Sequence, residues 1–232
     1  SSVTNFYLQI LKLNNKKVGS IGTLGVQDNK SLSRTINTSV DPVSLSKILN
    51  KFKKKRIDNV ILEASSHGLK QNRLDSINFN TGIFTNLSRD HLDYHKSYKD
   101  YLNSKMILFN RLMKKRSNII YDNEIPQSKI LKKISNSKNL SSTTIGNNKS
   151  DLTIIKHSYI GEKQLLSFKF KNKIYKFETG LIGKLQIKNL LMSILAANKS
   201  NISMNKIIRK IKNIKPINGR LEKIGKIKNN SI

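Results

Sequence analysis

V-I-L-E-A-S-S-H-G-L-K-Q-N-R-L at residues 60–74 and F-N-T-G-I-F-T-N-L-S-R-D-H-L-D-Y at residues 79–94 are the two segments that decide the fold of this chain. Each contains a short apolar run, at residues 60–62 and 82–84, in which β-branched residues are prominent and polar turn residues follow at once. That pattern is typical of a buried β-strand. We therefore predict a buried strand at each run.

Polar side chains gather directly after each predicted strand. They are Glu63, Ser65, Ser66, His67, Gln71 and Arg73 after the first strand, and Thr85, Asn86, Ser88, Asp90, His91 and Asp93 after the second. In an open α/β sheet, parallel strands are buried and ligands bind at their carboxyl ends. We therefore predict that both strands belong to such a sheet and that these side chains form a site.

The rest of the chain alternates between helical and strand patterns. Helices are predicted at residues 1–14, from residue 41 onward, and at 97–115, 125–134, 185–199 and 203–214, with Asp41, Ser97 and Ser203 as N-caps. Strands are predicted within 16–25, 118–121 and 142–145, with residues 27–40 as a loop and three antiparallel runs at 152–179. The predicted fold class is α/β, with a mostly parallel sheet flanked by helices and a small antiparallel β-meander.

Composition excludes several classes of protein. The 232 residues are 37% hydrophobic and include no cysteine, so a disulfide scaffold and a thiolate zinc site are excluded. No apolar run approaches the roughly 18 residues that span a bilayer. We expect a cytoplasmic monomer that is not inserted in a membrane.

The formal net charge of +30 raises nucleic acid as a partner. The lysines are spread along the whole chain and mixed with asparagine and isoleucine, which indicates a compositional bias rather than a binding face. We expect no nucleic-acid partner. A basic, non-catalytic nucleotide-binding or nucleic-acid-binding domain stays open as the alternative from another class.

Glu63, Asp90 and His91 offer the oxygen and imidazole ligands of a hard divalent cation such as Mg²⁺. The simpler alternative is that Glu63 is a solvated carboxylate at a strand end and that His67 and His95 are hydrogen-bonding loop residues. Hydroxyl, amide and guanidinium donors at Ser65, Gln71 and Arg73 suit a phosphate or a carboxylate. A Ser-His-Asp hydrolase built on S-S-H is a rival interpretation, although the G-x-S-x-G turn is lacking.

The start of the chain has two hydroxyl residues followed by a helical pattern, and no complete phosphate-binding G-x-x-x-x-G-K-[ST] motif occurs anywhere. Such a start is typical of a sequence cut immediately after the lysine of that motif. In this interpretation Ser1 is the hydroxyl that binds magnesium.

Several motifs together resemble the Mur ligases of peptidoglycan synthesis. The matching segments are I-G-T-L-G at 21–25, E-A-S-S-H-G-L-K-Q-N-R at 63–73, T-N-L-S-R-D-H-L-D-Y-H at 85–95, S-K-M-I-L-F at 104–109 and G-R-L-E at 219–222. The similarity spans almost the whole chain and is densest at residues 60–109. Within the family, the chain resembles most closely the members that install the third residue of the peptide stem.

The resemblance implies an ATP-dependent reaction that forms an amide bond and uses Mg²⁺. ATP would phosphorylate the carboxylate of UDP-N-acetylmuramoyl-L-Ala-D-Glu, and the amine of diaminopimelate or lysine would attack the acyl phosphate. The catalytic residues implied are Glu63, His91 and a carbamylated Lys105, which would also hold the magnesium ions. The alternative for Lys105 is an ordinary exposed lysine on a helix.

The resemblance also implies the binding residues. Ser65, Gln71 and Arg73 match contacts to the UDP-sugar-peptide, and Thr38 and Ser39 in N-T-S-V-D-P resemble the family's T-T-P-D-P loop. On the nucleotide side, Ser1, Asn189 and Arg220 are implied. Asn189 matches the second asparagine of an N-x-x-N motif in which Gln186 replaces the first.

The resemblance finally implies the domain organisation. Residues 1–217 would be the central ATP-binding domain, related to the P-loop NTPases and lacking its P-loop, and residues 218–232 would be the linker and the start of a C-terminal ligase domain. We expect the 232 residues alone to be inactive. Another Mur ligase, or a ligase similar to folylpolyglutamate synthetase, is the alternative within the superfamily.

Overall fold

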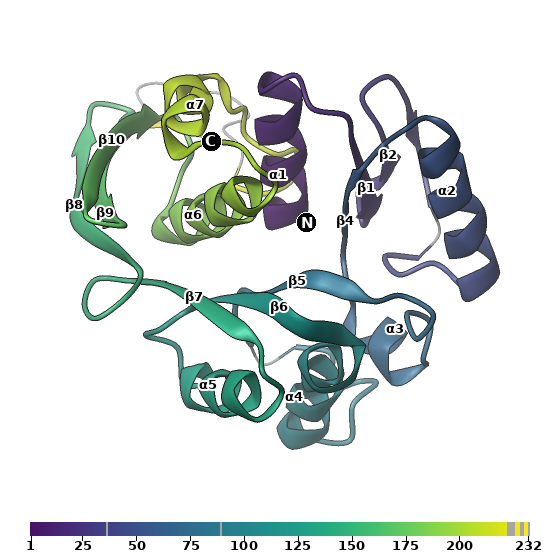
Figure 1. The fold of residues 1–232 in the computed structure, drawn as a ribbon. Helices are drawn as coiled ribbons and strands as arrows, with labels where there is room; N and C mark the ends of the chain where they lie inside the picture. The colour runs from purple at the N-terminus through teal and green to yellow at the C-terminus, as the bar shows by residue number, and fades with distance from the viewer. Residues whose placement is uncertain (36, 89, 222–225, 228–229, 232) are drawn as a thin grey trace.

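Two β-sheets and the helices on both of their faces form the frame of the molecule in a computed structural model (Figure 1). The structure describes residues 1–35, 37–88, 90–221, 226–227 and 230–231. The four-stranded sheet has the order β3-β2-β1-β4, and the six-stranded sheet has the order β10-β9-β8-β7-β6-β5. The strands are β1 (Val18–Gly22), β2 (Gly25–Gln27), β3 (Leu32–Ser33), β4 (Asn59–Leu62), β5 (Phe79–Phe84), β6 (Met113–Asp122), β7 (Ser141–Gly146), β8 (Leu152–Ile160), β9 (Lys163–Phe170) and β10 (Lys173–Thr179). A short antiparallel pair joins β11 (Lys226–Ile227) and β12 (Asn230–Ser231).

Helices connect the parallel strands and cover them. They are α1 (Ser2–Leu13), α2 (Pro42–Lys54), α3 (Ser66–Lys70), α4 (Tyr98–Ile107), the π-helical η1 (Leu108–Leu112), α5 (Ser128–Ser137), α6 (Lys184–Lys199), α7 (Met204–Lys210) and the 3-10 turn η2 (Ile211–Asn213). Figure 1 shows α1, α6 and α7 on one side of β5, β6 and β7, and α4 and α5 on the other side. The predicted α/β class is confirmed, because β5 to β8 pair in parallel and β1 pairs in parallel with β4.

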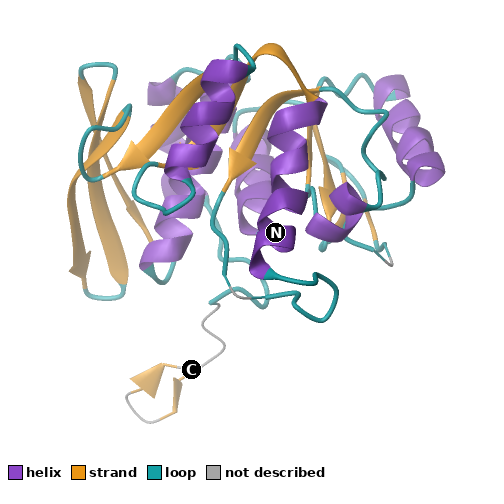
Figure 2. Ribbon diagram, turned by 90° about the horizontal axis from the view of Figure 1, so that it is seen from below, coloured by secondary structure: helices purple, strands orange, loops and turns teal. Residues whose placement is uncertain are grey.

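The predicted meander is also confirmed. Strands β8, β9 and β10 pair antiparallel and extend the six-stranded sheet at the end opposite β5, as Figure 2 shows at one end of the molecule. Their inward side chains belong to the core under α6, where Phe168 and Leu166 are fully buried. A second core lies on the other face of the sheets and includes Phe52, Leu69 and Phe109.

Local capping chemistry sets the start of two helices as predicted. Asp41 accepts a hydrogen bond from the backbone N–H of Ser44, and Pro42 occupies the first turn of α2. Ser97 accepts from the N–H of Asp100 at the start of α4. Ser203 is the N-cap residue of α7 as predicted, but its side chain makes no capping hydrogen bond.

The structure corrects the predicted helix at residues 97–115. The α-helix ends at Ile107, η1 follows, and strand β6 begins already at Met113. Parallel pairing with β5 explains the change, because Met113 lies opposite Phe79 and Ser117 donates a hydrogen bond to the Phe79 carbonyl. Smaller differences are the two-residue strand β3 within the predicted loop and the short helix α3 within the predicted turn.

The first strand of the deciding stretch differs from its prediction. Val60 in β4 is 37% exposed, and the other residues of this strand are half-buried. Strands β4 and β5 also belong to different sheets. Within the part of the chain that the structure describes, each of them has a hydrogen-bonded neighbour on one side only, so β4 cannot be buried as a central strand would be.

Among the helices of the described residues, none is long and apolar enough to cross a membrane. Arg89 and Glu222, which belong to two of the quoted motifs, lie outside the described residues.

The buried Asp28 ties the end of β2 to α2. Its carboxylate accepts the backbone N–H groups of Lys30 and Ser31 and pairs with Lys55 at the end of α2. Burial alone would raise the pKa of Asp28, but the hydrogen bonds from Lys55 and from both backbone groups hold this pKa well below its usual range. The carboxylate therefore stabilises the folded chain above the unfolded pKa of about 3.9.

Asp28→Asn should lower the free energy of unfolding by about 1.5–3 kcal/mol at pH 7, because hydrogen bonds to a charged acceptor are lost. A depressed pKa contributes stability that disappears as the pH falls through it. The difference between wild type and Asp28→Asn should therefore shrink from pH 7 to pH 3 in urea unfolding followed by circular dichroism. Asp58→Asn, at an exposed position, is the control. A difference that grows on acidification would contradict this account of Asp28.

Candidate functional site

A hollow of about 1190 Å³ separates β4 from β5. Every residue at positions 58–64 and 78–85 lines it, so both strands contribute along their whole length. Side chains of α1 and α6 close one face, and Leu69, Leu108 and Phe109 close the other. The two strands thus flank a common space although they share no hydrogen bond.

This hollow collects nearly all of the residues predicted for the site. Ten of the eleven line it, and they are Ser1, Thr38, Ser39, Glu63, Ser65, Gln71, Arg73, His91, Lys105 and Arg220. Asn189, on α6, does not line it. Ser1 and Arg220 are neighbours despite their separation in sequence, because Nη2 of Arg220 lies 3.4 Å from Oγ of Ser1.

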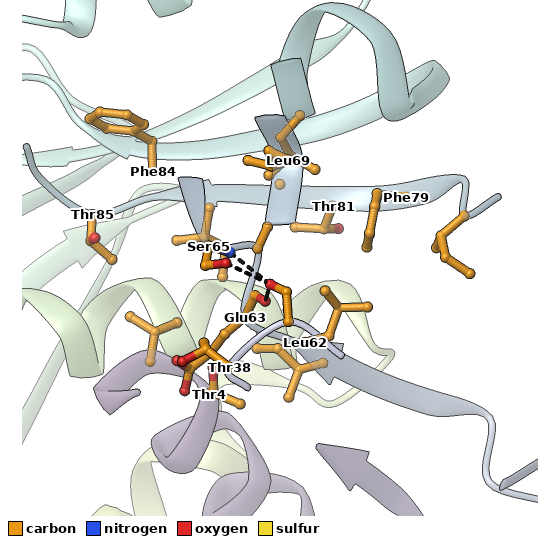
Figure 3. Close-up of a pocket in the computed structure, with 18 of the residues that line it drawn as sticks. Thr4, Thr38, Leu62, Glu63, Ser65, Leu69, Phe79, Thr81, Phe84 and Thr85 are labelled. Carbon is orange, nitrogen blue, oxygen red and sulfur yellow. Dashed lines mark hydrogen bonds between the residues drawn. The ribbon is translucent and has the colours of Figure 1, made fainter. Parts of the chain in front are cut away.

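Glu63 follows β4 directly and forms the acidic end of the hollow. Its Oε2 accepts a hydrogen bond from Thr23 at 2.8 Å, and the backbone nitrogen of Ser1 lies 3.1 Å from Oε1. Thr23 is in turn 3.1 Å from the hydroxyl of Thr38. Figure 3 shows Thr38 and Thr4 on one side of Glu63 and Thr81 of β5 on the other. The side chain is 14% exposed, which contradicts the alternative of a freely solvated carboxylate.

Ser39 holds the loop at residues 37–40 against the start of α3. Its hydroxyl lies 2.9 Å from both the Glu63 carbonyl and Oγ of Ser65, and it accepts the backbone N–H of Ser65. Ser65 caps α3 by accepting the N–H of Gly68, and Arg73 donates to the Ser39 carbonyl at 2.8 Å. Four of the predicted residues are therefore joined in one hydrogen-bonded group at the end of β4.

The loop after β5 brings His91 to the hollow. His91 has a left-handed backbone with φ of 57°, which is uncommon for a residue other than glycine, and its Nε2 lies 3.8 Å from Oδ2 of Asp90. Tyr94 of the same loop accepts a hydrogen bond from Gln71 at 3.1 Å. The loops that follow β4 and β5 therefore contact each other.

Lys105 points from α4 toward the same space. Its Nζ lies 5.1 Å from the centre of the Tyr101 ring. Burial lowers the pKa of Lys105, and the negative charge of Asp90 opposes that shift in part. The side chain is half-buried, so Lys105 is not the ordinary exposed lysine of the alternative interpretation. A lowered pKa increases the fraction of neutral, nucleophilic amine at a given pH.

The described residues include no group of three or more His, Cys, Asp or Glu side chains placed to hold a metal ion. The three residues Glu63, Asp90 and His91 are therefore not gathered into a preformed cage. Mg²⁺ is usually bound through one or two carboxylates together with waters and substrate phosphates. The carboxylates of Glu63 and Asp90, both on the lining of an open hollow, fit that mode of binding.

Sequence reasoning missed one contributor to the site, Thr23, and gave a second, His95, only a hydrogen-bonding role. Thr23 orients the Glu63 carboxylate, and its only signal was its place in the I-G-T-L-G motif. His95 was considered a hydrogen-bonding loop residue, which is confirmed by its contact of 2.9 Å with Ser66.

Asp100 lies on the far side of His95, so the order Ser-His-Asp does occur. Ser66 is only 2% exposed, and a buried hydroxyl cannot reach a substrate carbonyl, which argues against the hydrolase.

Comparison with known proteins now gives the family. The family model described as the Mur ligase middle domain matches residues 1–197, most of the chain. The chain belongs to the Mur ligase family. The resemblance drawn from the motifs is thereby confirmed.

The curated Mur ligases that this chain resembles are named UDP-N-acetylmuramoyl-L-alanyl-D-glutamate–2,6-diaminopimelate ligase. The protein of Rickettsia bellii (strain RML369-C) is 34% identical over 230 residues, which cover 97% of this chain and 48% of that protein. The protein of Wigglesworthia glossinidia brevipalpis is 35% identical over 227 residues, which cover 96% of this chain and 45% of that protein. The chain therefore spans about half the length of these relatives.

Solved structures of Mur ligases and of L. casei FPGS share the fold. A UDP-N-acetylmuramoyl-L-alanyl-D-glutamate–2,6-diaminopimelate ligase superposes with a TM-score of 0.87 at 22% identity over 96% of this chain and 46% of that chain. MurF of Thermotoga maritima in complex with ADP gives a TM-score of 0.73 at 14% identity, over 97% of this chain and 48% of that chain. The apo form of L. casei FPGS gives a TM-score of 0.72 at 13% identity, over 97% of this chain and 62% of that chain.

Gly68→Ala tests how tightly this Mur ligase site is packed. Alanine normally stabilises a helix relative to glycine by about 0.5–1 kcal/mol. At Gly68, however, an added Cβ would lie 2.5 Å from Cβ of the buried Ser39. We expect the variant to lose about 1–3 kcal/mol of stability through overpacking.

Gly180→Ala is the matched control, because nothing lies within 4 Å of an added Cβ at that position. Its free energy of unfolding should stay within about 1 kcal/mol of wild type. Urea unfolding of the two variants at pH 7 makes the comparison. Equal stability of the two would show that the loop carrying Ser39 is not packed against α3 as described.

Proposed function

We propose that this chain is the central ATP-binding domain of a ligase that adds 2,6-diaminopimelate to UDP-N-acetylmuramoyl-L-Ala-D-Glu. The observation that carries the proposal is the hollow between β4 and β5, which gathers ten of the predicted site residues from distant parts of the chain. The names of the relatives support diaminopimelate as the added amino acid in preference to lysine.

The proposed reaction has two steps. The γ-phosphoryl group of ATP is transferred to the carboxylate of the UDP-linked dipeptide, which forms an acyl phosphate and ADP. The amine of diaminopimelate then attacks the acyl carbon, phosphate leaves, and the nitrogen loses a proton as the amide forms. Activation of the carboxylate supplies a good leaving group, so the chain needs to bind and orient the reactants rather than act as a nucleophile.

The UDP-linked substrate is assigned to the side of the hollow near α3. Ser65, Gln71 and Arg73 offer donors there, and Arg73 carries the positive charge that suits a phosphate or carboxylate. Thr38 and Ser39 extend this row of donors from the adjacent loop. Because Ser39, Ser65 and Arg73 already hydrogen-bond one another, they hold a fixed arrangement before substrate arrives.

The nucleotide is assigned to the side near Ser1 and Arg220. The Arg220 guanidinium faces the Ser1 hydroxyl and is available to a phosphate group. Asn189 lies outside this hollow, so an adenine contact by Asn189 requires a nucleotide that extends along α6. Glu63, His91, Lys105 and Ser1 are the residues proposed to hold Mg²⁺, which when bound would neutralise charge on the phosphates.

We assign residues 1–217 to the central domain and residues 218–232 to the linker and the start of a C-terminal ligase domain. The open edges of β4 and β5 support this assignment, because among the described residues neither strand has a hydrogen-bonded partner on the side that borders the hollow. We propose that the strand leading to the phosphate-binding loop fills the part of the hollow between the facing edges of β4 and β5 in the complete polypeptide, and that the part beyond the strand ends stays open to the substrates.

We also propose that the complete protein acts in the cytoplasm, where ATP and UDP-linked precursors are found. One chain supplies all of the residues assigned to the site, so a monomer suffices for it.

The proposed function predicts ligation by the complete polypeptide that contains this chain. With Mg²⁺, ATP, UDP-N-acetylmuramoyl-L-Ala-D-Glu and diaminopimelate, we expect ADP and the UDP-linked tripeptide, measured by mass spectrometry. Lysine in place of diaminopimelate should give much less product, and residues 1–232 alone should give none.

Absence of product, together with tight binding to nucleic acid that weakens steeply with added salt, would overturn the proposal in favour of the basic binding domain. Product with another carboxylate substrate would point instead to a different ligase of the same superfamily.

Lys105 should react with carbon dioxide to form a carbamate, which converts a cation into a carboxylate-like ligand. In ¹³C-bicarbonate, residues 1–232 should give a carbamate resonance in the ¹³C NMR spectrum that disappears in Lys105→Ala. Because only the neutral amine reacts, and burial lowers the pKa of Lys105, the resonance should weaken as the pH falls.

In the complete polypeptide, Lys105→Ala should reduce kcat by about 100-fold. A short-chain carboxylate should restore part of the activity by occupying the vacated place. Lys99→Ala, at an exposed position on the same helix, is the control and should behave as wild type. Unchanged activity of Lys105→Ala would remove Lys105 from the proposed metal site.

A further inference from the structure

Five rings from three segments of the chain pack together beside the hollow. His67 comes from α3, Tyr101 comes from α4, and His91, Tyr94 and His95 come from the loop between β5 and α4. The closest pair is His67 and Tyr94, with ring centres 4.0 Å apart. The proposed roles use only His91, so the purpose of the other four rings is open.

His95 lies at the centre of this ring cluster. It is 1% exposed, and its ring centre lies 5.0 Å from those of Tyr94 and Tyr101 and 5.5 Å from that of His67. Its Nε2 is 2.9 Å from the hydroxyl of Ser66, which is itself buried. Burying a polar ring costs free energy unless its nitrogens are hydrogen-bonded, so the hydrogen bond between Nε2 and Ser66 constrains the orientation of the His95 ring.

Nδ1 of His95 is buried and makes no hydrogen bond to any of the described residues, and the charged group that faces it is the carboxylate of Asp100. Oδ2 of Asp100 lies 3.5 Å from Nδ1, and it is held there by Lys70 at 2.5 Å and by the N–H of Lys96 at 3.2 Å. A carboxylate on this side favours an N–H at Nδ1 over a lone pair. In that tautomer Nε2 has the lone pair and accepts a hydrogen bond from Ser66, 2.9 Å away.

The two sides of His95 lead to different parts of the site. Ser66 is the first residue of α3 and follows Ser65 directly, so its hydrogen bond fixes the start of the turn that carries Ser65 and Gln71. On the other side, the His95 ring packs on Tyr101. The centre of the Tyr101 ring lies 5.7 Å from that of His91, and the Lys105 amine lies over the Tyr101 ring. His95 is thus the one described residue that touches both Ser66 and Tyr101 through its ring or hydrogen bonds.

We propose that His95 is a positioning residue that holds the substrate-binding turn after β4 and the pair His91 and Lys105 in one fixed arrangement, through its hydrogen bond to Ser66 and its packing on Tyr101. The expected change in KM and kcat rests on the proposed function. The fixed arrangement of the two loops rests on geometry alone. His95 itself contacts no substrate.

A hydrophobic side chain of similar size cannot replace His95 in this role. Leucine would fill the space between Tyr94 and Tyr101 but would leave the Ser66 hydroxyl buried without a partner. The hydroxyl would then turn toward another acceptor and the start of α3 would lose its fixed position. Glutamine, by contrast, places an amide group where Nε2 lies and can keep a hydrogen bond to Ser66.

The test measures steady-state kinetics of the complete polypeptide with four variants. Ser66→Ala should raise KM for the UDP-linked dipeptide about tenfold and leave kcat unchanged, as expected for loss of a group that orients a binding residue. His95→Leu should raise the same KM and also lower kcat about tenfold, because Tyr101 loses its support as well. His95→Gln should recover the KM to within about threefold of wild type. His157→Gln is the control, since His157 contacts Gln164 and Tyr159 on the distant meander.

The proposal is overturned if Ser66→Ala and His95→Leu both match His157→Gln. It is also overturned if KM for ATP rises as much as KM for the UDP-linked dipeptide, because general loosening of the domain would act on both substrates. If His95→Leu does not fold, His95→Gln and Ser66→Ala still decide between these outcomes.

A second measurement separates this proposal from the proposed function. In residues 1–232, two-bond ¹H–¹⁵N NMR spectra should show His95 protonated at Nδ1, and Ser66→Ala should shift both its Nε2 resonance and the side-chain amide of Gln71. If wild type lacks ligase activity but these shifts occur, the proposed function fails and the positioning role stands. If neither resonance moves, the positioning role is wrong whatever the activity.

Discussion

The arrangement of the site depends on how β4 and β5 face one another across the hollow. Each strand has a hydrogen-bonded partner on one side and none, among the described residues, on the side that borders the hollow. Unpaired strand edges are costly when they are buried, so the space between them remains polar and accessible to a ligand or to another strand. Because both strands end at this space, the loops that follow them are brought together, and the chemistry of the chain is concentrated there.

Short polar side chains hold these loops in place. Ser39, Ser65 and Ser66 each use one hydroxyl to join two segments, and the small size of serine lets the backbones approach closely, as the position of Gly68 against Ser39 shows. A hydrogen bond of this kind contributes only about 0.5–1.5 kcal/mol of net stability. Its greater value here is geometric, since preorganised donors need little rearrangement when an anionic substrate binds.

The elements predicted correctly are those with strong local signals. Asp41 followed by Pro42 marks the start of α2, Ser97 marks the start of α4, and alternation marks the meander at residues 152–179. The helix predicted through Lys115 failed because pairing with β5 draws the chain into β6 at Met113, against its helical pattern. Ser203 does occupy the N-cap position of α7, but its side chain makes no capping hydrogen bond, because a suitable position does not ensure that a side chain turns toward the backbone.

The sequence by itself determined the α/β class, the family and the identity of the polar residues that follow each strand, because hydrophobic period, capping chemistry and motifs are local properties. Tertiary structure alone decided which of those residues meet. Packing of α1 beside α6 brings Ser1 near Arg220, Asn189 on α6 stays outside the hollow, and Thr23 reaches Glu63 from another strand end. The His95 contacts were equally invisible in the sequence. Such contacts join residues tens to hundreds of positions apart, and they follow from how helices and sheets share one core rather than from any short-range preference.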